Sequence, residues 1–450
     1  MIRYHARWVL PVGAPAVRDG TVVVDGACIA WVGPRAALPA AMAGTDEELG
    51  DAILMPGLVN AHIHLDLAAF AGALDGLPFF AWVRTLVRGL RETMGEEALA
   101  EISRWSVADQ LAHGVTTMGH TGPSRVAFDA IREMGARGLA FLEVFGPDPA
   151  ECAASLAGVR ARVDAARRDE TPLVRIGVSP HAPYSVSDAL YAAVAGYARD
   201  DALPLAVHIA ESADESRLVS AGEGEFAHFL SARGIRVAPR AVSPVALLER
   251  MGVLATGPLC IHVVRADADD ILRLGGSGAR VAHCPRANAW FGHGTAPVRE
   301  LRRAGIAVGL GTDSIASNED VRLLAEARDA ADESLAPSGR LELATLGGAR
   351  ALWCDDVVGI LAPGMDADLA AFAIDDPIAC DQDPARYLLQ QCAAAPSLVT
   401  IVAGVVRARH GRALALHGAG IARVDRHRAR VHAWVAGLAN ASDPILDSQA

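Results

Sequence analysis

The sequence predicts an α/β protein, with a barrel of parallel strand–helix units and a smaller domain rich in strands. Between residues 57 and 355, short apolar runs alternate with longer amphipathic stretches, a pattern typical of parallel βα units. Histidines and acidic residues follow the ends of several of these runs. The chain has 450 residues, whereas a barrel needs roughly 250. The length therefore leaves room for a satellite domain.

The satellite domain is predicted from both ends of the chain. Residues 21–33 hold two β-rich runs around Asp25-Gly26, a signal typical of a hairpin. Strand-type runs return at 368–374 and 397–406. We therefore expect residues 1–56 and 356–415 to form one small sheet domain, interrupted by the barrel at 57–355. Residues 416–450 are expected to form an Arg-rich helix and a tail.

Within the barrel region, helical patterns at 97–111 and 188–198 precede strand-type runs at 115–118 and 204–209. Further strands are predicted at 175–178, 259–263, 279–283 and 306–310. In such barrels the chemistry takes place at the C-terminal ends of the strands. The polar residues at these predicted ends are His62, His64, His181, His208, His262, His283 and Asp313.

His62 and His64 are predicted to bind a metal ion together. Side chains two residues apart on a strand point to the same face, and His-x-His at a strand end favours metal ligation over a structural role. His208 would be the third ligand and Asp313 the fourth. A turn or helix-cap role for Asp313 is the alternative.

Glu211 and His262 are predicted to act on the reacting groups. Glu211 follows His208 by three residues and would serve as a general acid or base, although a helix N-terminal carboxylate is compatible with the same position. His262 would hold or polarise the attacking water. His181 is a candidate substrate contact, and His283 could orient the ligands. A structural role remains the alternative for both residues.

Three histidines and one carboxylate leave a coordination position open for water, which is typical of a catalytic site. Such a metal lowers the pKa of its water to around 7. Zinc and iron both accept these ligands, and we expect one divalent ion, zinc first. All 41 basic residues are arginine. The absence of lysine excludes a Schiff-base lysine and a carbamylated lysine that bridges two metals.

Composition excludes several other classes of protein. The chain is 52% hydrophobic and 21% charged, which predicts a large core rather than disorder. Its net charge of −12 argues against nucleic acid or an anionic membrane as a partner. Seven scattered cysteines without a C-x-x-C pair indicate reduced, intracellular usage. Without an apolar run of ~18 residues or a signal peptide, we expect a cytoplasmic protein.

The chain resembles the amidohydrolase superfamily, in particular its cytosine-deaminase-like and chlorohydrolase-like aminohydrolase branch. The resemblance covers nearly the whole chain and depends on residues 56–64, 114–117, 179–184, 208–211, 283–288, 311–314, 344–352 and 363–369. It implies a (β/α)8 TIM-type barrel with a small β-sandwich domain formed by both chain ends. It also implies a homo-oligomer, as a dimer or larger.

By motif, the resemblance implies that one metal is bound by His62, His64, His208 and Asp313. Glu211 becomes the proton shuttle and His262 the residue that polarises the water. The implied reaction is attack of the metal-activated water on an amidine-type ring carbon. Asp313 takes the water proton, Glu211 protonates the ring nitrogen, and ammonia leaves.

Residues 65–67, 78–84 and 291–297 are similar to those of aminodeoxyfutalosine deaminases, which act on an adenine nucleoside. This similarity predicts hydrolytic deamination of an aminated purine. Phe79 and Trp82 could stack on the ring, and Arg84 could meet a carboxylate. The alternative for residues 78–84 is an amphipathic helix that only packs on the barrel. Asp66 and His120 depart from the residues common among relatives.

Two other functions stay open at this stage. The same site could deaminate or dechlorinate another N-heterocycle, namely a pterin, 8-oxoguanine or an s-triazine. A more remote alternative is a silent barrel used as a binding scaffold. Such a scaffold would be free to lose ligands, yet all six site positions are filled here.

Overall fold

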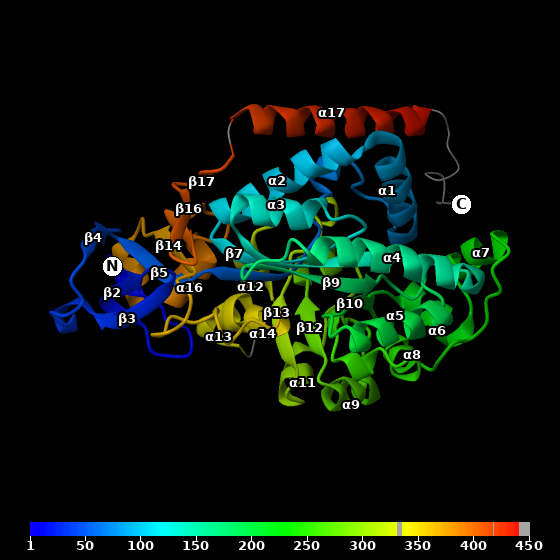
Figure 1. Cartoon of the computed structure of the whole chain (residues 1–450), viewed down its shortest axis with the longest axis horizontal. Coiled ribbons are helices and arrows are strands. Elements are labelled where there is room, and N and C mark those ends of the chain that lie inside the picture. Colours follow the sequence, from blue (N-terminus) through cyan, green and yellow to red (C-terminus); the bar gives the residue numbers. More distant parts are fainter. Residues whose placement is uncertain (331–334, 417, 441–450) are drawn as a thin grey trace.

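The computed structural model describes residues 1–330, 335–416 and 418–440. Figure 1 shows a strand-rich part that contains the N-terminus beside a larger part built from strands and helices. The long helix α17 (Gly418–Asn440) lies along the larger part. Among the described residues, no helix combines the length and the apolar character needed to span a membrane.

The larger part contains two four-stranded parallel sheets, and the strands of each follow one another in chain order. The first consists of β6 (Leu58–Ile63), β7 (Val115–Gly122), β8 (Arg137–Val144) and β9 (Val174–Pro180). The second consists of β10 (Ala206–Ile209), β11 (Leu259–His262), β12 (Arg280–His283) and β13 (Ala307–Leu310).

Isolated parallel bridges join these two sheets at both of their edges. Val178 of β9 pairs with Leu205 just before β10, and Ile63 of β6 pairs with Asp313 just after β13. Side chains from both sheets also share one buried apolar cluster, to which Val59, Phe141 and Ile261 belong. The eight strands therefore follow the order and the contacts expected of a barrel. Every strand predicted in this region is present, and β8 was not predicted.

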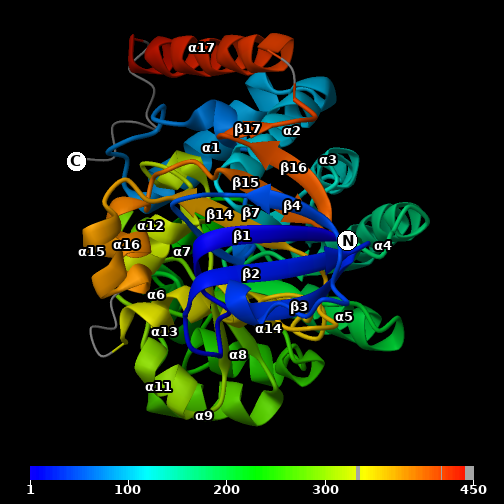
Figure 2. The same cartoon turned by 90° about the vertical axis from the view of Figure 1, so that its left-hand side faces the viewer.

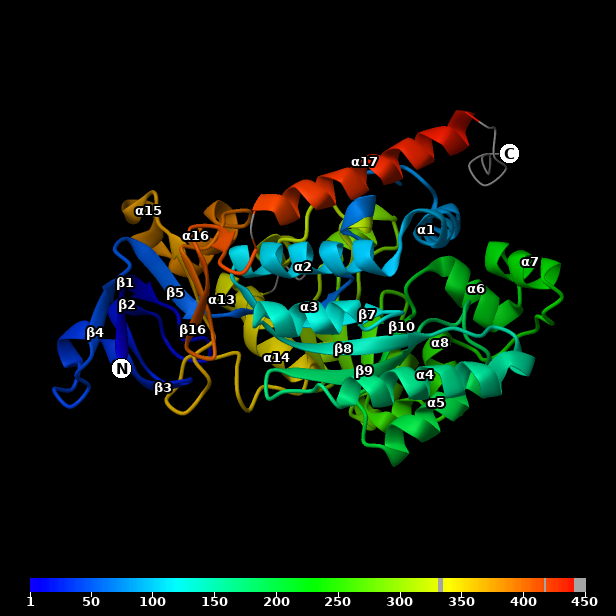
Figure 3. The ribbon, with the colours of Figure 1, turned by 45° about the horizontal axis from the view of Figure 1, so that its top comes forward.

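Helices connect the strands and cover their outer side (Figure 3). Their first turns are often capped by short polar side chains, as sequence signals would lead one to expect. Ser187 Oγ accepts a hydrogen bond from the Leu190 amide at the start of α5, and Asp267 Oδ1 accepts one from the Asp270 amide at the start of α9. The α-helices before α17 are α1 (Phe79–Thr93), α2 (Glu96–Ala112), α3 (Val126–Met134), α4 (Cys152–Arg167), α5 (Asp188–Asp200), α6 (Ala213–Ala221), α7 (Glu225–Ala232), α8 (Pro244–Arg250), α9 (Ala268–Ser277), α10 (Pro285–Trp290), α11 (Val298–Arg303), α12 (Leu323–Asp329), α13 (Pro337–Glu342), α14 (Gly348–Ala351), α15 (Pro377–Gln382) and α16 (Pro384–Gln391).

The strand-rich part is a single nine-stranded sheet built from both ends of the chain (Figure 2). Its order is β17-β16-β15-β14-β5-β1-β2-β3, and β4 pairs with β1. The predicted hairpin is confirmed as the antiparallel pair β2–β3. A sheet shared by the two chain ends is thus present, while its description as a sandwich remains a prediction. The strand bounds are β1 (Ile2–Val9), β2 (Val17–Asp25), β3 (Cys28–Pro34), β4 (Thr45–Glu48), β5 (Ala52–Pro56), β14 (Leu369–Ala373), β15 (Val399–Val402), β16 (Val405–Arg409) and β17 (Arg412–Ala413).

Helix α17 confirms the helix predicted near the C-terminus. Its apolar side packs on α1, α2 and the short helix η2 (Ala68–Phe70), and Val431 is fully buried there. Two hydrogen bonds add to this packing. Trp434 Nε1 donates to Glu92 Oε2 at 2.8 Å, and Arg428 Nε donates to the Ala68 carbonyl. The predicted tail at 441–450 lies outside the described residues.

A buried ion pair ties the parallel sheet to the terminal sheet. Arg137, at the start of β8, donates from Nε to Asp368 Oδ2 at 3.1 Å and from Nη2 to Asp366 Oδ2 at 2.6 Å. The side chain of Asp368 is only 1% exposed, and its Oδ1 also accepts a hydrogen bond from the Ala403 amide. Both carboxylates lie just before β14, so the pair fixes one sheet against the other.

Replacing Arg137 with alanine is expected to lower the free energy of unfolding by about 3–5 kcal/mol, because the buried Asp368 carboxylate would lose its cation. Denaturant unfolding measures the change. The matched control is Arg35→Ala, which breaks the exposed pair with Glu48 and should cost less than about 1 kcal/mol. Equal effects of the two substitutions would contradict a structural role for the buried pair.

Candidate metal and active site

The predicted metal-binding residues converge at the C-terminal ends of the strands. His62 is the second-last residue of β6 and His64 lies just beyond the strand. His208 lies in β10, and Asp313 follows β13. The Nε2 atoms of His62 and His64 lie 3.3 Å and 3.4 Å from Asp313 Oδ1. The ring of His208 is centred 5.0 Å from that of His62 and stacks on that of His64 at 5.5 Å.

The geometry of these side chains suits a metal ion. His62, His64 and Asp313 each offer a ligand atom within 4.8 Å of the other two, and so do His62, His208 and His262. Ligand atoms at about 2.0–2.1 Å from a tetrahedral ion lie about 3.3 Å from one another, close to the two distances measured here. Both ring nitrogens of His62 and the Nδ1 atom of His208 are buried without a hydrogen-bond partner. An ion bound at His62 Nε2, the nitrogen that faces Asp313, would give one of these orphaned nitrogens a partner.

Hydrogen bonds on the far side of two imidazoles set their tautomers. His64 Nδ1 lies 2.9 Å from the Thr121 carbonyl oxygen, which can only accept, so Nδ1 carries the proton. His262 Nδ1 likewise faces Asn288 Oδ1 at 3.0 Å. In both rings the lone pair is then left on Nε2, which faces the cluster.

The backbone at the site is held in an unusual conformation. Ala210, His262 and Asp313 have positive φ values of 51°, 74° and 55°. Non-glycine residues in this region cost on the order of 1–3 kcal/mol each, and such strain gathers at functional sites. The strained residues terminate three different strands, and each either carries or adjoins a predicted site residue.

Glu211 lies beside this cluster in a buried position. Its Oε1 atom is 3.6 Å from His262 Nε2. Burial first, and then the negative charges of Asp313 and Glu215, raise the pKa of Glu211 well above its usual value. A carboxyl group that retains its proton near neutral pH can donate that proton, as a general acid must.

Glu215 holds the turn that carries Glu211. Its two carboxylate oxygens accept hydrogen bonds at 2.8 Å from the backbone amides of Ala210 and Glu211. This acceptor pair stabilises the positive φ of Ala210 and fixes the direction of the Glu211 side chain. No signal in the sequence pattern marked Glu215, apart from its place in the first turn of α6 after the cap Ser212.

Replacing Glu215 with alanine should leave two buried amides without acceptors, each at a cost of about 1–3 kcal/mol. We expect a lower free energy of unfolding and, because Glu211 loses its support, a fall in turnover larger than the fall in bound metal. Glu215→Gln retains one carbonyl acceptor. Its free energy of unfolding and its turnover should therefore lie between those of Glu215→Ala and those of the parent. Denaturant unfolding, metal analysis and turnover of the three proteins test this order, and an unchanged Glu215→Ala protein would contradict it.

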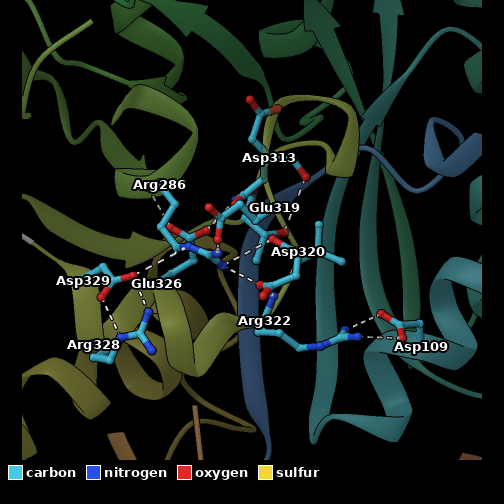
Figure 4. A network of polar contacts seen from close by, with 12 residues as sticks. Asp109, Arg286, Asp313, Glu319, Asp320, Arg322, Glu326, Arg328 and Asp329 are labelled. Atoms are coloured by element: carbon cyan, nitrogen blue, oxygen red, sulfur yellow. Dashed lines mark hydrogen bonds and ion pairs between the residues drawn. The ribbon is translucent and has the colours of Figure 1, made fainter. Parts of the chain in front are cut away.

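Asp313 is supported by a polar network in the loop that follows it (Figure 4). Ser317 Oγ donates to Asp313 Oδ2 at 3.2 Å, and Asn318 Nδ2 bridges the Thr312 carbonyl and Glu326 Oε1. Burial would raise the pKa of Asp313, but the neighbouring imidazoles of His62, His64 and His262 outweigh it and lower the pKa. The ionised carboxylate is the form that binds metal and accepts a proton.

The outer part of this network anchors the loop to two helices. Arg286, in α10, pairs with Asp320 and Glu319, and Arg322 donates to Asp109 of α2 at 2.5 Å and 3.2 Å. Glu326 in α12 also accepts a hydrogen bond from the Arg286 amide at 3.0 Å. The loop that carries Asp313 is therefore fixed from several directions.

The four predicted substrate contacts differ in where they lie. The ring of His181 lies 4.9 Å from that of His208, and Phe79 contacts His293 and Phe291 close to Glu211. Trp82 is buried and donates from Nε1 to the Ala316 carbonyl, and its ring lies 5.2 Å from that of Phe291. Arg84 lies over the rings of Phe80 and Phe229 at 5.6 Å and 5.5 Å.

Three further histidines lie near the cluster. His120 is buried, and its Nδ1 accepts a hydrogen bond from the Leu65 amide. His283 is buried with neither ring nitrogen paired. His293, to which no role was assigned from the sequence, has its Nε2 atom 3.7 Å from Glu211 Oε1. Asn288, which orients His262, was quoted only as part of a motif.

The fold and the site together define a class of protein. In this class, parallel strands carry a cluster of histidines and carboxylates that suits one metal ion. Residues 53–407 match the model of the amidohydrolase family. The chain belongs to this family, and the predicted membership is confirmed. It is therefore a hydrolase that acts on carbon–nitrogen bonds other than peptide bonds.

Named relatives agree with this membership. The chain is 32% identical to a 5-methylthioadenosine/S-adenosylhomocysteine deaminase of Nitratidesulfovibrio vulgaris, over 90% of both chains. It is 32% identical to an aminodeoxyfutalosine deaminase of Deinococcus radiodurans, over 69% of this chain and 75% of the other. Among solved structures, a zinc-bound adenosine deaminase from Xanthomonas campestris matches with a TM-score of 0.82 and 26% identity, over 96% of this chain and 98% of the other.

Proposed function

We propose that this chain is a metal-dependent hydrolytic deaminase of an aminated purine, acting on an adenine nucleoside such as aminodeoxyfutalosine and releasing ammonia. The observation that carries the proposal is the buried cluster of His62, His64, His208 and Asp313, with Glu211 and His262 beside it. The three relatives described above are named as deaminases of adenosine-type compounds or of aminodeoxyfutalosine, which supports the same reaction.

The proposed cofactor is one divalent ion, zinc first and iron as the alternative, with His62, His64, His208 and Asp313 as its ligands. Such an ion, when bound, lowers the pKa of a water molecule to around 7 and so supplies a nucleophile at neutral pH. Zinc in the similar adenosine deaminase structure supports the choice of metal.

The chain's own residues move the protons. Asp313, ionised among the imidazoles, accepts a proton from the attacking water. Glu211 holds a proton in its buried carboxyl group and delivers it to the ring nitrogen beside the reacting carbon. His262, with its lone pair on Nε2, accepts a hydrogen bond from the water and keeps it directed at the ring. The proton held by Asp313 then passes to the amino group, which leaves as ammonia. Glu211 recovers its proton from the hydroxyl group left on the ring carbon, which becomes a carbonyl.

The proposal includes the architecture around the site. The two parallel sheets are taken as the halves of one (β/α)8 barrel spanning residues 57–355. Residues 1–56 and 356–415 form the flanking β-sandwich domain, and 416–450 the C-terminal helix and tail. The proposed substrate contacts are Phe79, Trp82, Arg84 and His181. Of these, His181 contacts the ring of His208 and Phe79 that of His293. We also propose a cytoplasmic homo-oligomer that binds a small heterocycle and no nucleic acid.

The first experiment is an ultraviolet scan of the zinc- or iron-loaded protein with adenosine, methylthioadenosine, adenosylhomocysteine and aminodeoxyfutalosine. Deamination converts the adenine spectrum to that of hypoxanthine, and we expect this shift with at least one substrate. If protein with one metal per chain shifts none of them, adenine deamination is wrong. Pterin, 8-oxoguanine and s-triazine would then be assayed. A chain that binds no metal would indicate the silent scaffold instead.

A further inference from the structure

His293 occupies a position that the proposed reaction does not use. It follows α10 in a loop, and its side chain is only 7% exposed. The Nε2 atom is buried and has no hydrogen-bond partner. Its distance of 3.7 Å from Glu211 Oε1 is too long for a hydrogen bond. A buried polar atom left in this state costs about 1–3 kcal/mol, and that cost disappears if a ligand supplies the missing partner.

The surroundings of His293 suit a flat ligand. The ring of Phe79, from the start of α1, meets it edge-on at 4.8 Å and 88°. The ring of Phe291, from the same loop as His293, stacks on it at 5.3 Å and 27°. Aromatic walls with one unpaired nitrogen among them match a heteroaromatic ring that offers a polar edge.

Glu211 Oε1 faces two imidazole nitrogens at similar distances. His262 Nε2 lies at 3.6 Å and His293 Nε2 at 3.7 Å. Asn288 connects the two histidines, because its Oδ1 faces His262 Nδ1 and its backbone carbonyl accepts a hydrogen bond from the His293 amide at 2.9 Å. One turn of chain therefore sets both rings relative to the same carboxyl oxygen.

We propose that His293 is a further substrate-contacting residue. Its Nε2 atom hydrogen-bonds to a ring nitrogen or carbonyl of the bound N-heterocycle, near the nitrogen that Glu211 protonates. This inference rests on the proposed function and extends it to substrate selection. Burial lowers the pKa of His293 to about 4, so the ring is neutral at pH 7 and offers one N–H donor and one acceptor.

The test compares His293→Phe, which keeps a ring but removes the nitrogen, with His293→Gln, whose amide reaches a position similar to that of Nε2. His410→Phe is the control, because His410 is exposed in the turn between β16 and β17. Bound metal, thermal unfolding, kcat and KM are measured for each protein. Calorimetry measures the binding of the reaction product, a hypoxanthine nucleoside, which needs no turnover.

We expect His293→Phe to lose about 10- to 100-fold in kcat/KM and in product affinity, which is the effect of one hydrogen bond with a buried partner. His293→Gln should recover most of this loss, and metal content should stay unchanged in all variants. An effect of His293→Phe below threefold, or an equal loss in the Phe and Gln variants, would overturn the proposal. Equal losses would mean that the ring only packs.

The two proposals can fail separately. If the metal-loaded parent deaminates none of the adenine nucleosides, the proposed function fails. Binding of 8-oxoguanine, a pterin and an s-triazine to the parent and the two His293 variants then decides the role of His293. A heterocycle that binds the parent and the Gln variant but not the Phe variant supports the contact. If no heterocycle distinguishes the variants, the contact is overturned while the metal site is unaffected.

Discussion

Replacing His62 with alanine is expected to remove both the bound metal and the activity. His62 is fully buried, its Nε2 lies 3.3 Å from Asp313 Oδ1, and neither ring nitrogen has a hydrogen-bond partner. Among the described residues, three groups could hold an ion, and the third consists of Glu143, His181 and His208. His62 belongs to the other two. Loss of a residue that only supports a ligand already costs 10- to 100-fold in metal affinity or activity. Loss of a ligand itself should cost more than about 100-fold.

Elemental analysis after dialysis should show about one metal per chain in the parent and a small fraction of that in His62→Ala. Asp313→Ala should behave in the same way. The matched control is His5→Ala, because His5 is also buried but lies in β1 of the terminal sheet. It belongs to none of the three groups that could hold an ion among the described residues. Full metal content in His62→Ala would refute the assigned ligand set.

Replacing Glu211 with glutamine is expected to abolish turnover while metal stays bound. The amide has nearly the shape of the carboxyl group but cannot deliver a proton to the ring nitrogen. General acid–base groups contribute typically 10²- to 10⁴-fold to rate, and we expect kcat to fall within or beyond this range. Burial raises the pKa of Glu211, which favours the protonated carboxyl group that the glutamine variant cannot form.

Stopped assays with excess enzyme give the rate of the variant, and elemental analysis gives its metal. Product binding should change little, because the shape of the site is kept. Glu249→Gln, at a side chain that is 57% exposed, controls for the loss of one negative charge. Full activity in Glu211→Gln would eliminate the proton-transfer role. Loss of metal together with activity would instead make Glu211 a part of the metal site.

Much of the fold was predictable, because strands and helices repeat with different periods. The alternation over 57–355 marked parallel βα units, and seven of the eight strands of the two parallel sheets were expected from apolar runs. β8 was missed because a short apolar run cannot be assigned to strand or helix from periodicity alone. The satellite sheet was predicted from returning strands, but the nine-stranded order required long-range pairing such as that of β5 with β14.

In the candidate site, too, some residues could be assigned from the sequence and others only from the tertiary structure. His62 and His64 could be assigned together because two residues on one strand face share a direction whatever the rest of the fold does. Glu215, Asn288 and His293 could not be found in this way. Their roles depend on how close they lie to residues of other segments. Glutamate, asparagine and histidine are common residue types, and their presence in a sequence does not indicate such a distance. Trp82 was a candidate ring contact by residue type, but nothing in the sequence indicated that its indole N–H donates to the Ala316 carbonyl.

The sequence by itself determined that the chain is a parallel α/β protein, and it predicted metal ligands at the strand ends. Those features depend on residue type and on the local spacing of apolar residues, and both can be read from the sequence. Only the tertiary structure decided that Asp313 lies 3.3 Å from His62, that Glu215 supports Glu211, and that His293 faces the same carboxyl oxygen as His262. These are distances between residues from different strands and loops, and packing sets them only when the eight strands come together.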